Sequence, residues 1–156
     1  MAAVYAVLQD ARHDGVRDRT GPRPRGFAQR IESTAAEFAV AKWLGRPIEI
    51  CFQEGHGDVG ELEVRWVTEE HYCLLVRPDD PPEVPYLPVT GRAGLYRLKG
   101  WLHGHEAKRP EWLQSPNGRP PVYLAPQSCL HPVDTLAQAL DEAVFVQGQL
   151  DLGGLG

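Results

Sequence analysis

The hydrophobic pattern of this chain changes its period at residues 45–47, and this change limits the folds open to it. Residues 27–44 contain neither Gly nor Pro, and they are bounded by Pro24 and Gly26 on one side and by Gly45 and Pro47 on the other. Because Gly and Pro commonly end helices, the stretch predicts one helix over residues 26–44. Apolar side chains cover most of its helical wheel, so we expect this helix to be largely buried.

After Pro47 the pattern becomes strand-like, with apolar and polar residues alternating between Gly, Pro and acidic turns. Strands are predicted over residues 48–52, 61–67, 72–78, 86–89, 95–104 and 122–126, and a second helix over 133–147. Consecutive strands joined by short loops usually pair antiparallel. We therefore predict an α/β fold with a mixed central sheet flanked by helices.

The 156 residues fit a single domain. The hinge-like "RTGPRPRG" at 19–26 sets residues 1–25 apart as an N-terminal arm or short helix, which leaves 26–147 as the domain and 148–156 as a C-terminal tail. No apolar run approaches the roughly 18 residues of a membrane span, and the N-terminus lacks the basic start of a secretory signal. The three cysteines are odd in number and widely spaced, which argues against a disulfide framework and is typical of proteins in a reducing compartment. We expect a cytoplasmic protein without a membrane partner.

The net charge of −5 hides an uneven distribution. Residues 1–30 carry six Arg against three Asp, and residues 92–119 carry six Lys or Arg against two Glu. Residues 31–91 between them hold twelve acidic and four basic groups. Two basic margins around an acidic centre suit phosphate-contacting arms around a cation site, and they equally suit solvated faces.

The stretch "GDVGELEVRW" at 57–66 contains most of the candidate site residues. Glu61, Glu63 and Arg65 alternate along the predicted strand 61–67, so they share one face, and Asp58 precedes them in a glycine-flanked bend. Two carboxylates held close repel each other unless a cation lies between them, and Mg²⁺ prefers a few carboxylates plus water and phosphate. We expect Asp58 and Glu63 to bind Mg²⁺ or Mn²⁺, with Glu61 as a solvated rim charge. The alternative is an exposed edge strand on which Glu63 and Arg65 form a surface pair.

A helix with a buried Glu, then a hairpin carrying Asp and a strand carrying Glu-x-Lys, resembles the PD-(D/E)XK nuclease superfamily. The segments "IESTAAEFAVAKWLG", "GDVGELEVRW", "YCLLVRPDD", "GWLHGHEAKRPEWL" and "GRPPVYLAPQSCL" are similar to a group of small phage-encoded proteins of that superfamily. The resemblance spans about residues 27–131. It implies a restriction-endonuclease-like core with Glu37, Asp58, Glu63 and Arg65 as the catalytic residues.

Two positions depart from the family pattern. Arg65 stands where the superfamily usually has Lys, and "STAAE" stands where the phage group tends to have Gly just before the helix Glu. Because the pKa of Arg exceeds about 12, Arg65 cannot accept a proton at neutral pH, although it can orient water or a phosphate.

The resemblance implies metal-dependent hydrolysis of DNA phosphodiesters, an endonuclease-like deoxyribonuclease activity of phage type. Asp58 and Glu63 would hold Mg²⁺ or Mn²⁺, Glu37 would complete the metal shell or bind water, and Arg65 would stabilise phosphorane charge. The alternative is a catalytically degenerate module of the same fold that binds DNA or a host or phage protein without cleaving.

Basic side chains near the second basic margin are candidate contacts to a nucleic-acid backbone. They are Arg97, Lys99, His105, Lys108 and Arg109. The same residues would also serve as ordinary surface charges. DNA is the expected partner, and the sequence leaves a homodimer open.

Overall fold

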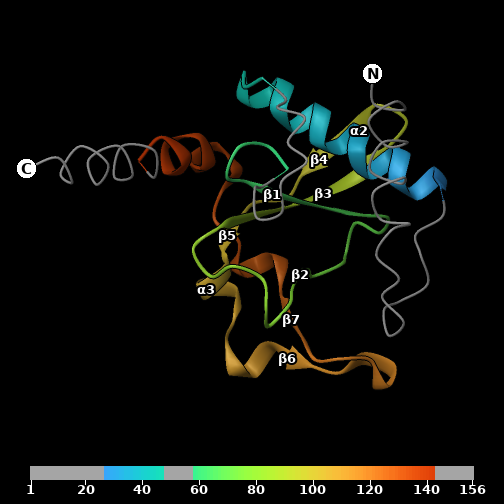
Figure 1. Ribbon diagram of the computed structural model, residues 1–156, viewed down its shortest axis with the longest axis vertical. Helices are drawn as coiled ribbons and strands as arrows, with labels where there is room; N and C mark the ends of the chain where they lie inside the picture. Colours follow the sequence, from blue (N-terminus) through green and yellow to red (C-terminus); the bar gives the residue numbers. More distant parts are fainter. Residues whose placement is uncertain (1–26, 48–57, 143–156) are drawn as a thin grey trace, which may run out of the picture.

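The computed structural model describes residues 27–47 and 58–142 (Figure 1). The predicted N-terminal arm or short helix 1–25, the predicted strand 48–52, the tail 148–156 and the end of the predicted helix 133–147 lie outside these ranges. Within the described residues, no helix is both long enough and apolar enough to cross a membrane.

The long helix is confirmed as α2 (Phe27–Leu44). It ends where the sequence requires: Gly45 adopts a φ of 65°, the Gly45 N–H donates to the Lys42 carbonyl, and the Arg46 N–H donates to the Ala41 carbonyl. These two bonds form a Schellman cap, in which glycine takes the left-handed position at low cost. Trp43, near the end of α2, is 46% exposed, whereas the fully buried side chains of the helix include Ala36, Val40 and Ala41. The helix lies on the outside of a sheet and buries one face only.

The strands form two small sheets instead of one central sheet (Figure 1). The first sheet is mixed and contains β1 (Glu63–Val67), β3 (Pro85–Arg92), β4 (Leu95–Leu98) and β5 (Leu102–His103). The second is antiparallel and contains β2 (Leu74–Val76), β7 (Val122–Ala125) and β6 (Leu113–Gln114). Three short helical turns lie between these strands: α3 (Gly104–Ala107), η1 (Pro110–Trp112) and η2 (Pro116–Gly118). Two more follow the last strand, β7: η3 (Gln127–Cys129) and η4 (Val133–Thr135).

The strand pairing differs from the prediction at the strand that carries the site. β1 and β2 follow one another in sequence but do not pair, because β2 leaves for the second sheet. β1 pairs instead with β3, in parallel, with Glu63 opposite Tyr86 and Arg65 opposite Pro88. β3 then pairs antiparallel with β4 and with β5. The predicted single strand 95–104 is interrupted at Gly100, whose φ is 119°.

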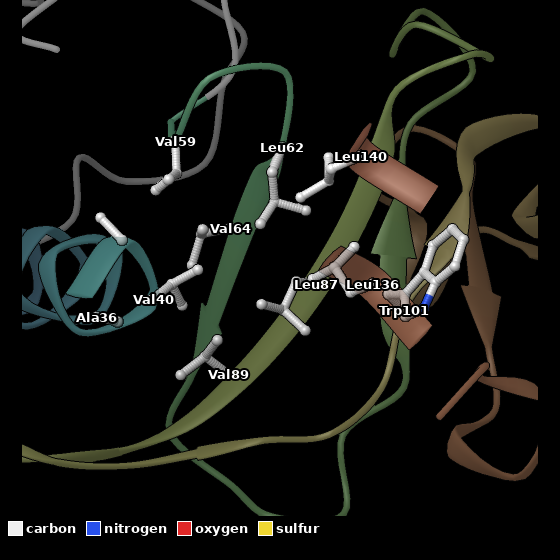
Figure 2. Close-up of a cluster of buried hydrophobic side chains, with 11 residues drawn as sticks. Ala36, Val40, Val59, Leu62, Val64, Leu87, Val89, Trp101, Leu136 and Leu140 are labelled. Atoms are coloured by element: carbon white, nitrogen blue, oxygen red, sulfur yellow. The ribbon is translucent and has the colours of Figure 1, made fainter. Parts of the chain in front are cut away.

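One face of the first sheet forms the main core (Figure 2). Val64 and Leu87 project from neighbouring strands toward Ala36 and Val40 of α2. Residues 136–142, which are helical, pack on the same face through two buried leucines. Because side chains alternate along a strand, Glu63 and Arg65 of β1 point to the opposite face, away from α2.

A smaller core joins that opposite face to the second sheet. Tyr86 of β3 and Leu102 of β5 are both buried there against Leu74 and Val76 of β2. The loop from β2 to β3 therefore runs past the face that carries Glu63 and Arg65. This placement brings residues 77–82 next to the candidate site.

Candidate functional site

A tight turn places Asp58 beside the first strand. The Val59 and Leu62 backbones exchange hydrogen bonds of 3.1 and 3.2 Å, and Gly60 has a φ of 64° at the first central position of the turn. Two-residue hairpin turns favour glycine at that position. The chain therefore doubles back, and the Asp58 Oδ2 atom accepts a 2.8 Å hydrogen bond from the Val64 N–H. Glu61 lies in this turn and is exposed, as expected for a rim charge.

Glu63 is the most perturbed acid of the site. Burial, together with the nearby charges of Asp58 and Asp80, raises the pKa of Glu63 to about 7, and Arg65 offsets part of this shift. Only 26% of the Glu63 side chain is exposed. Among the described residues its carboxylate accepts no hydrogen bond, and its one ion pair is a 3.5 Å contact with Arg65. A carboxylate in this state lacks the partners that would stabilise its charge.

Arg65 is held by a residue that the sequence analysis did not select. Its Nη2 atom donates a 3.0 Å hydrogen bond to Asp80 Oδ2, and its guanidinium lies 5.1 Å from the centre of the Tyr86 ring. The Arg65 Nε atom is buried and has no hydrogen-bond partner. Burial and Asp80 raise the pKa of Tyr86 to about 12, so that hydroxyl stays protonated. Asp80 had a sequence signal, since it closes the strand-and-acid stretch "LLVRPDD".

Glu37, the fourth residue of the predicted site, lies on a different element from these acids. It is buried on α2, in the stretch that contributes Ala36 and Val40 to the main core. The charged groups that act on Glu63 are Asp58, Arg65 and Asp80. The structure therefore groups Glu63 with Asp58 and Asp80, whereas Glu37 belongs to the helix on the other face of β1.

A divalent metal such as Mg²⁺ needs oxygen ligands that converge on one point. Within the described ranges, no group of three or more His, Cys, Asp or Glu side chains is arranged to hold a metal ion. The negative charge of Asp58 does act on Glu63 and helps to raise its pKa, so the two carboxylates lie near each other. Mg²⁺ is often bound by one or two carboxylates and completed by waters and substrate phosphates. The pair fits a magnesium site of that open kind and does not fit an all-protein cage.

Two of the basic residues predicted to contact nucleic acid pair with an acid. Arg97 Nη1 lies 2.6 Å from the carboxylate of Glu70, and Lys99 Nζ lies 4.0 Å from the same carboxylate. The Arg97 side chain is 71% exposed. Exposed pairs of this kind contribute little to stability, so Arg97 can exchange Glu70 for a phosphate at low cost.

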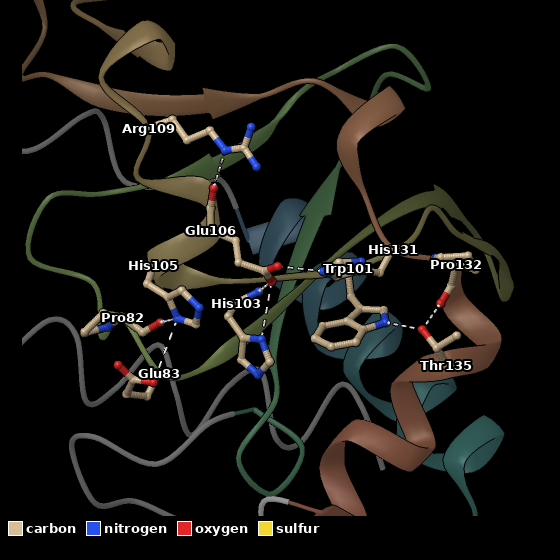
Figure 3. A network of polar contacts seen from close by, with 10 residues as sticks. All are labelled: Pro82, Glu83, Trp101, His103, His105, Glu106, Arg109, His131, Pro132 and Thr135. Atoms are coloured by element: carbon tan, nitrogen blue, oxygen red, sulfur yellow. Dashed lines mark hydrogen bonds and ion pairs between the residues drawn. The ribbon is translucent and has the colours of Figure 1, made fainter.

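The three other basic candidates lie in or just after α3. Figure 3 shows His105 and Arg109. His105 Nδ1 is 3.1 Å from the Pro82 carbonyl oxygen and 3.8 Å from the Glu83 carboxylate. Arg109 Nε donates to a carbonyl within α3, and its guanidinium stacks 4.7 Å from the centre of the Trp112 ring. The predicted basic contacts thus all have intramolecular partners.

Lys108 is the basic candidate closest to the acidic site. Its Nζ atom donates 3.0 Å to the Pro78 carbonyl and also donates to the Asp80 carbonyl. It therefore ties the end of α3 to the turn that carries the Asp80 carboxylate.

Comparison of the chain with protein-family models, with characterised proteins and with solved structures finds no match.

Proposed function

We propose that this protein hydrolyses DNA phosphodiesters with the help of Mg²⁺ or Mn²⁺, on a restriction-endonuclease-like core. The supporting observation is the Glu63 carboxylate, which accepts no hydrogen bond from the described residues and whose pKa is raised by burial first and then by the charges of Asp58 and Asp80. A divalent cation between Asp58 and Glu63 would remove that repulsion.

Asp58 and Glu63 would hold the metal, and Glu63 would be ionised when the metal is bound. When bound, such a metal polarises a phosphoryl oxygen and lowers the pKa of a coordinated water. Arg65 would bind a non-bridging phosphate oxygen, because its guanidinium lies beside Glu63 and its side chain is 24% exposed. Arg65 would not act as a base, since it remains protonated.

A second candidate is a module that binds DNA or a phage or host protein without cleaving. It is favoured by Arg65, which cannot accept a proton and already donates to Asp80. Such a module would bind DNA with the same affinity after the Glu63 carboxylate is removed.

The test is cleavage of linear, circular and single-stranded DNA with Mg²⁺ or Mn²⁺, beside calorimetry of Mn²⁺ binding. Asp58→Asn and Glu63→Gln should abolish both cleavage and metal binding, whereas the exposed control Glu61→Gln should retain both. A Glu37→Gln variant tests whether the helix carboxylate takes part. Absence of both Mn²⁺ binding and cleavage in the wild type would reject the proposed hydrolase activity. DNA binding without cleavage would support the non-cleaving module instead.

A further inference from the structure

We propose that Asp80 is a positioning residue, which keeps the Arg65 guanidinium from closing onto Glu63 and so keeps the Glu63 carboxylate available to a divalent cation. This inference rests on the proposed function, because it assigns a second carboxylate to the control of the same site.

A single atom of Arg65 is shared between the two acids. Arg65 Nη2 is 3.0 Å from Asp80 Oδ2, which is a hydrogen bond, and 3.5 Å from Glu63 Oε2, which is an ion pair without one. The Asp80 side chain is also less exposed than that of Glu63, at 13% against 26%. Less water around Asp80 leaves its attraction for the guanidinium less screened. Asp80 therefore takes the hydrogen bond for which Glu63 would otherwise compete.

Asp80 is fixed without the help of Arg65. Its Oδ2 atom also accepts a 2.8 Å hydrogen bond from the Arg77 N–H, which closes the turn around the carboxylate. Lys108 binds the carbonyl of Asp80, and the Tyr86 hydroxyl donates 3.2 Å to the carbonyl of Pro81. Contacts from α3 and from β3 thus hold the turn from both sides. The Asp80 carboxylate is therefore positioned by contacts other than its hydrogen bond with Arg65.

Removal of Asp80 would leave Glu63 as the nearest acceptor for Arg65. An Arg–carboxylate pair is strong and often bidentate, so it would occupy the oxygens that the metal needs. Asp80 would also attract a cation by simple charge, without acting through Arg65. These two effects are separated by removing Asp80 with and without Arg65 present.

The experiment is calorimetric titration of Mn²⁺ into the full chain and its Asp80→Asn, Arg65→Met and Asp80→Asn/Arg65→Met variants. Asp80→Asn should weaken Mn²⁺ binding about tenfold, as for other residues that orient metal ligands. In the Arg65→Met background the same substitution should change the Mn²⁺ affinity less than about twofold, because no guanidinium remains that could pair with Glu63. Asp79→Asn, an exposed neighbour with the same loss of charge, is the matched control and should bind like the wild type.

Thermal unfolding of each variant, recorded beside the titrations, shows whether it is folded. If Asp80→Asn does not fold, the Lys108→Met variant takes its place, because the loss of Lys108 loosens the turn that carries Asp80 and leaves the Asp80 carboxylate intact. Lys108→Met should weaken Mn²⁺ binding only while Arg65 is present. Equal weakening in both backgrounds, or none in either, would overturn the positioning role. A wild type that binds no Mn²⁺ would instead reject the proposed function itself.

Discussion

His131 Nε2 lies 2.8 Å from Glu106 Oε1 and thereby ties α3 to the segment that leads into residues 136–142 (Figure 3). The other carboxylate oxygen of Glu106 accepts a 2.9 Å hydrogen bond from the His103 N–H. Burial alone would raise the pKa of Glu106, but these hydrogen bonds and the histidine charges outweigh it, so the pKa is lowered. Trp101 packs against both histidines and donates 3.0 Å to the Thr135 hydroxyl. The contacts join α3 to the main core.

Glu106→Gln should therefore destabilise the protein at pH 7. The loss should be about 1 kcal/mol, the usual net contribution of an intramolecular hydrogen bond. A lowered folded-state pKa contributes stability that is present above pH 4.5 and is lost as pH falls through the lowered value. The difference between the wild type and Glu106→Gln should thus shrink between pH 7 and pH 3 in urea denaturation. Glu111→Gln, at an exposed site, is the control. A difference that does not depend on pH would contradict the charge-dependent contribution.

The metal-free protein should become less stable than its Glu63→Gln variant as pH rises. The folded-state pKa of Glu63 is raised from 4.5 to about 7, so the folded state binds the proton more tightly than the unfolded state. The unfolding free energy contributed by this group therefore falls between pH 4.5 and pH 7 and is constant above that. At pH 8 the variant should be the more stable by on the order of 2 kcal/mol. Chemical denaturation of both proteins in EDTA at pH 5 and pH 8 measures this. Equal stabilities at pH 8 would show that the Glu63 charge is already compensated.

Gly104→Ala should disturb the candidate site through the backbone. A Cβ atom at residue 104 would lie 2.3 Å from the Pro81 carbonyl oxygen and 2.9 Å from the Pro82 Cα. Overpacking against the backbone should cost about 1–3 kcal/mol and push the turn that carries Asp80 away from α3. We expect a lower melting temperature and weaker Mn²⁺ binding. In Gly118→Ala the new Cβ meets no atom within 4 Å, but residue 118 has a φ of 69°, which strains alanine. This control should therefore lower stability without weakening Mn²⁺ binding. Unchanged stability of Gly104→Ala would show that α3 is not tightly packed.

A substitution in the turn between β3 and β4 should make the protein more stable. Ala93 and Gly94 have φ angles of 53° and 84°, as in a type I′ turn, and the Ala93 N–H donates to Glu32 of α2. Asn-Gly is a strongly preferred pair for this turn, whereas Ala is strained in the left-handed region. Ala93→Asn should therefore raise the melting temperature by about 2–4 °C. Calorimetry would show it, and Ala93→Val should have the opposite effect. A lower melting temperature for Ala93→Asn would argue against the turn type.

The helix and most strands could be predicted because their signals are local. The predicted helix 26–44 matches α2 within one residue, since Pro and Gly bound it on both sides. The predicted strand 61–67 begins two residues late, at Glu63, because Gly60 draws Glu61 into the turn. Glu63 and Arg65 share a face as alternation requires, and Asp58 was placed beside them by its glycine-flanked bend.

The pairing of the strands and the role of Asp80 were not predictable in the same way. Short loops favour antiparallel hairpins, and nothing local to β1 indicates that it skips β2 and pairs with β3. Asp80 reaches Arg65 only because that pairing brings the loop before β3 beside the start of β1. Glu37 was grouped with Glu63 from the family resemblance alone, and the structure shows α2 packed on the face of β1 opposite to the Glu63 side chain.

The parallel pairing of β1 with β3 also sets the order in which the protein can assemble. A hairpin closes early because its two strands are neighbours in the chain, but a parallel pair must wait for the chain to leave the sheet and return. Asp58 and Glu63 can meet as soon as the turn at Gly60 forms, whereas Arg65 finds Asp80 only after β3 has docked. Until β3 docks, Asp58, Glu63 and Arg65 lie close together along the chain, and Asp80 is not yet positioned to accept the hydrogen bond from Arg65.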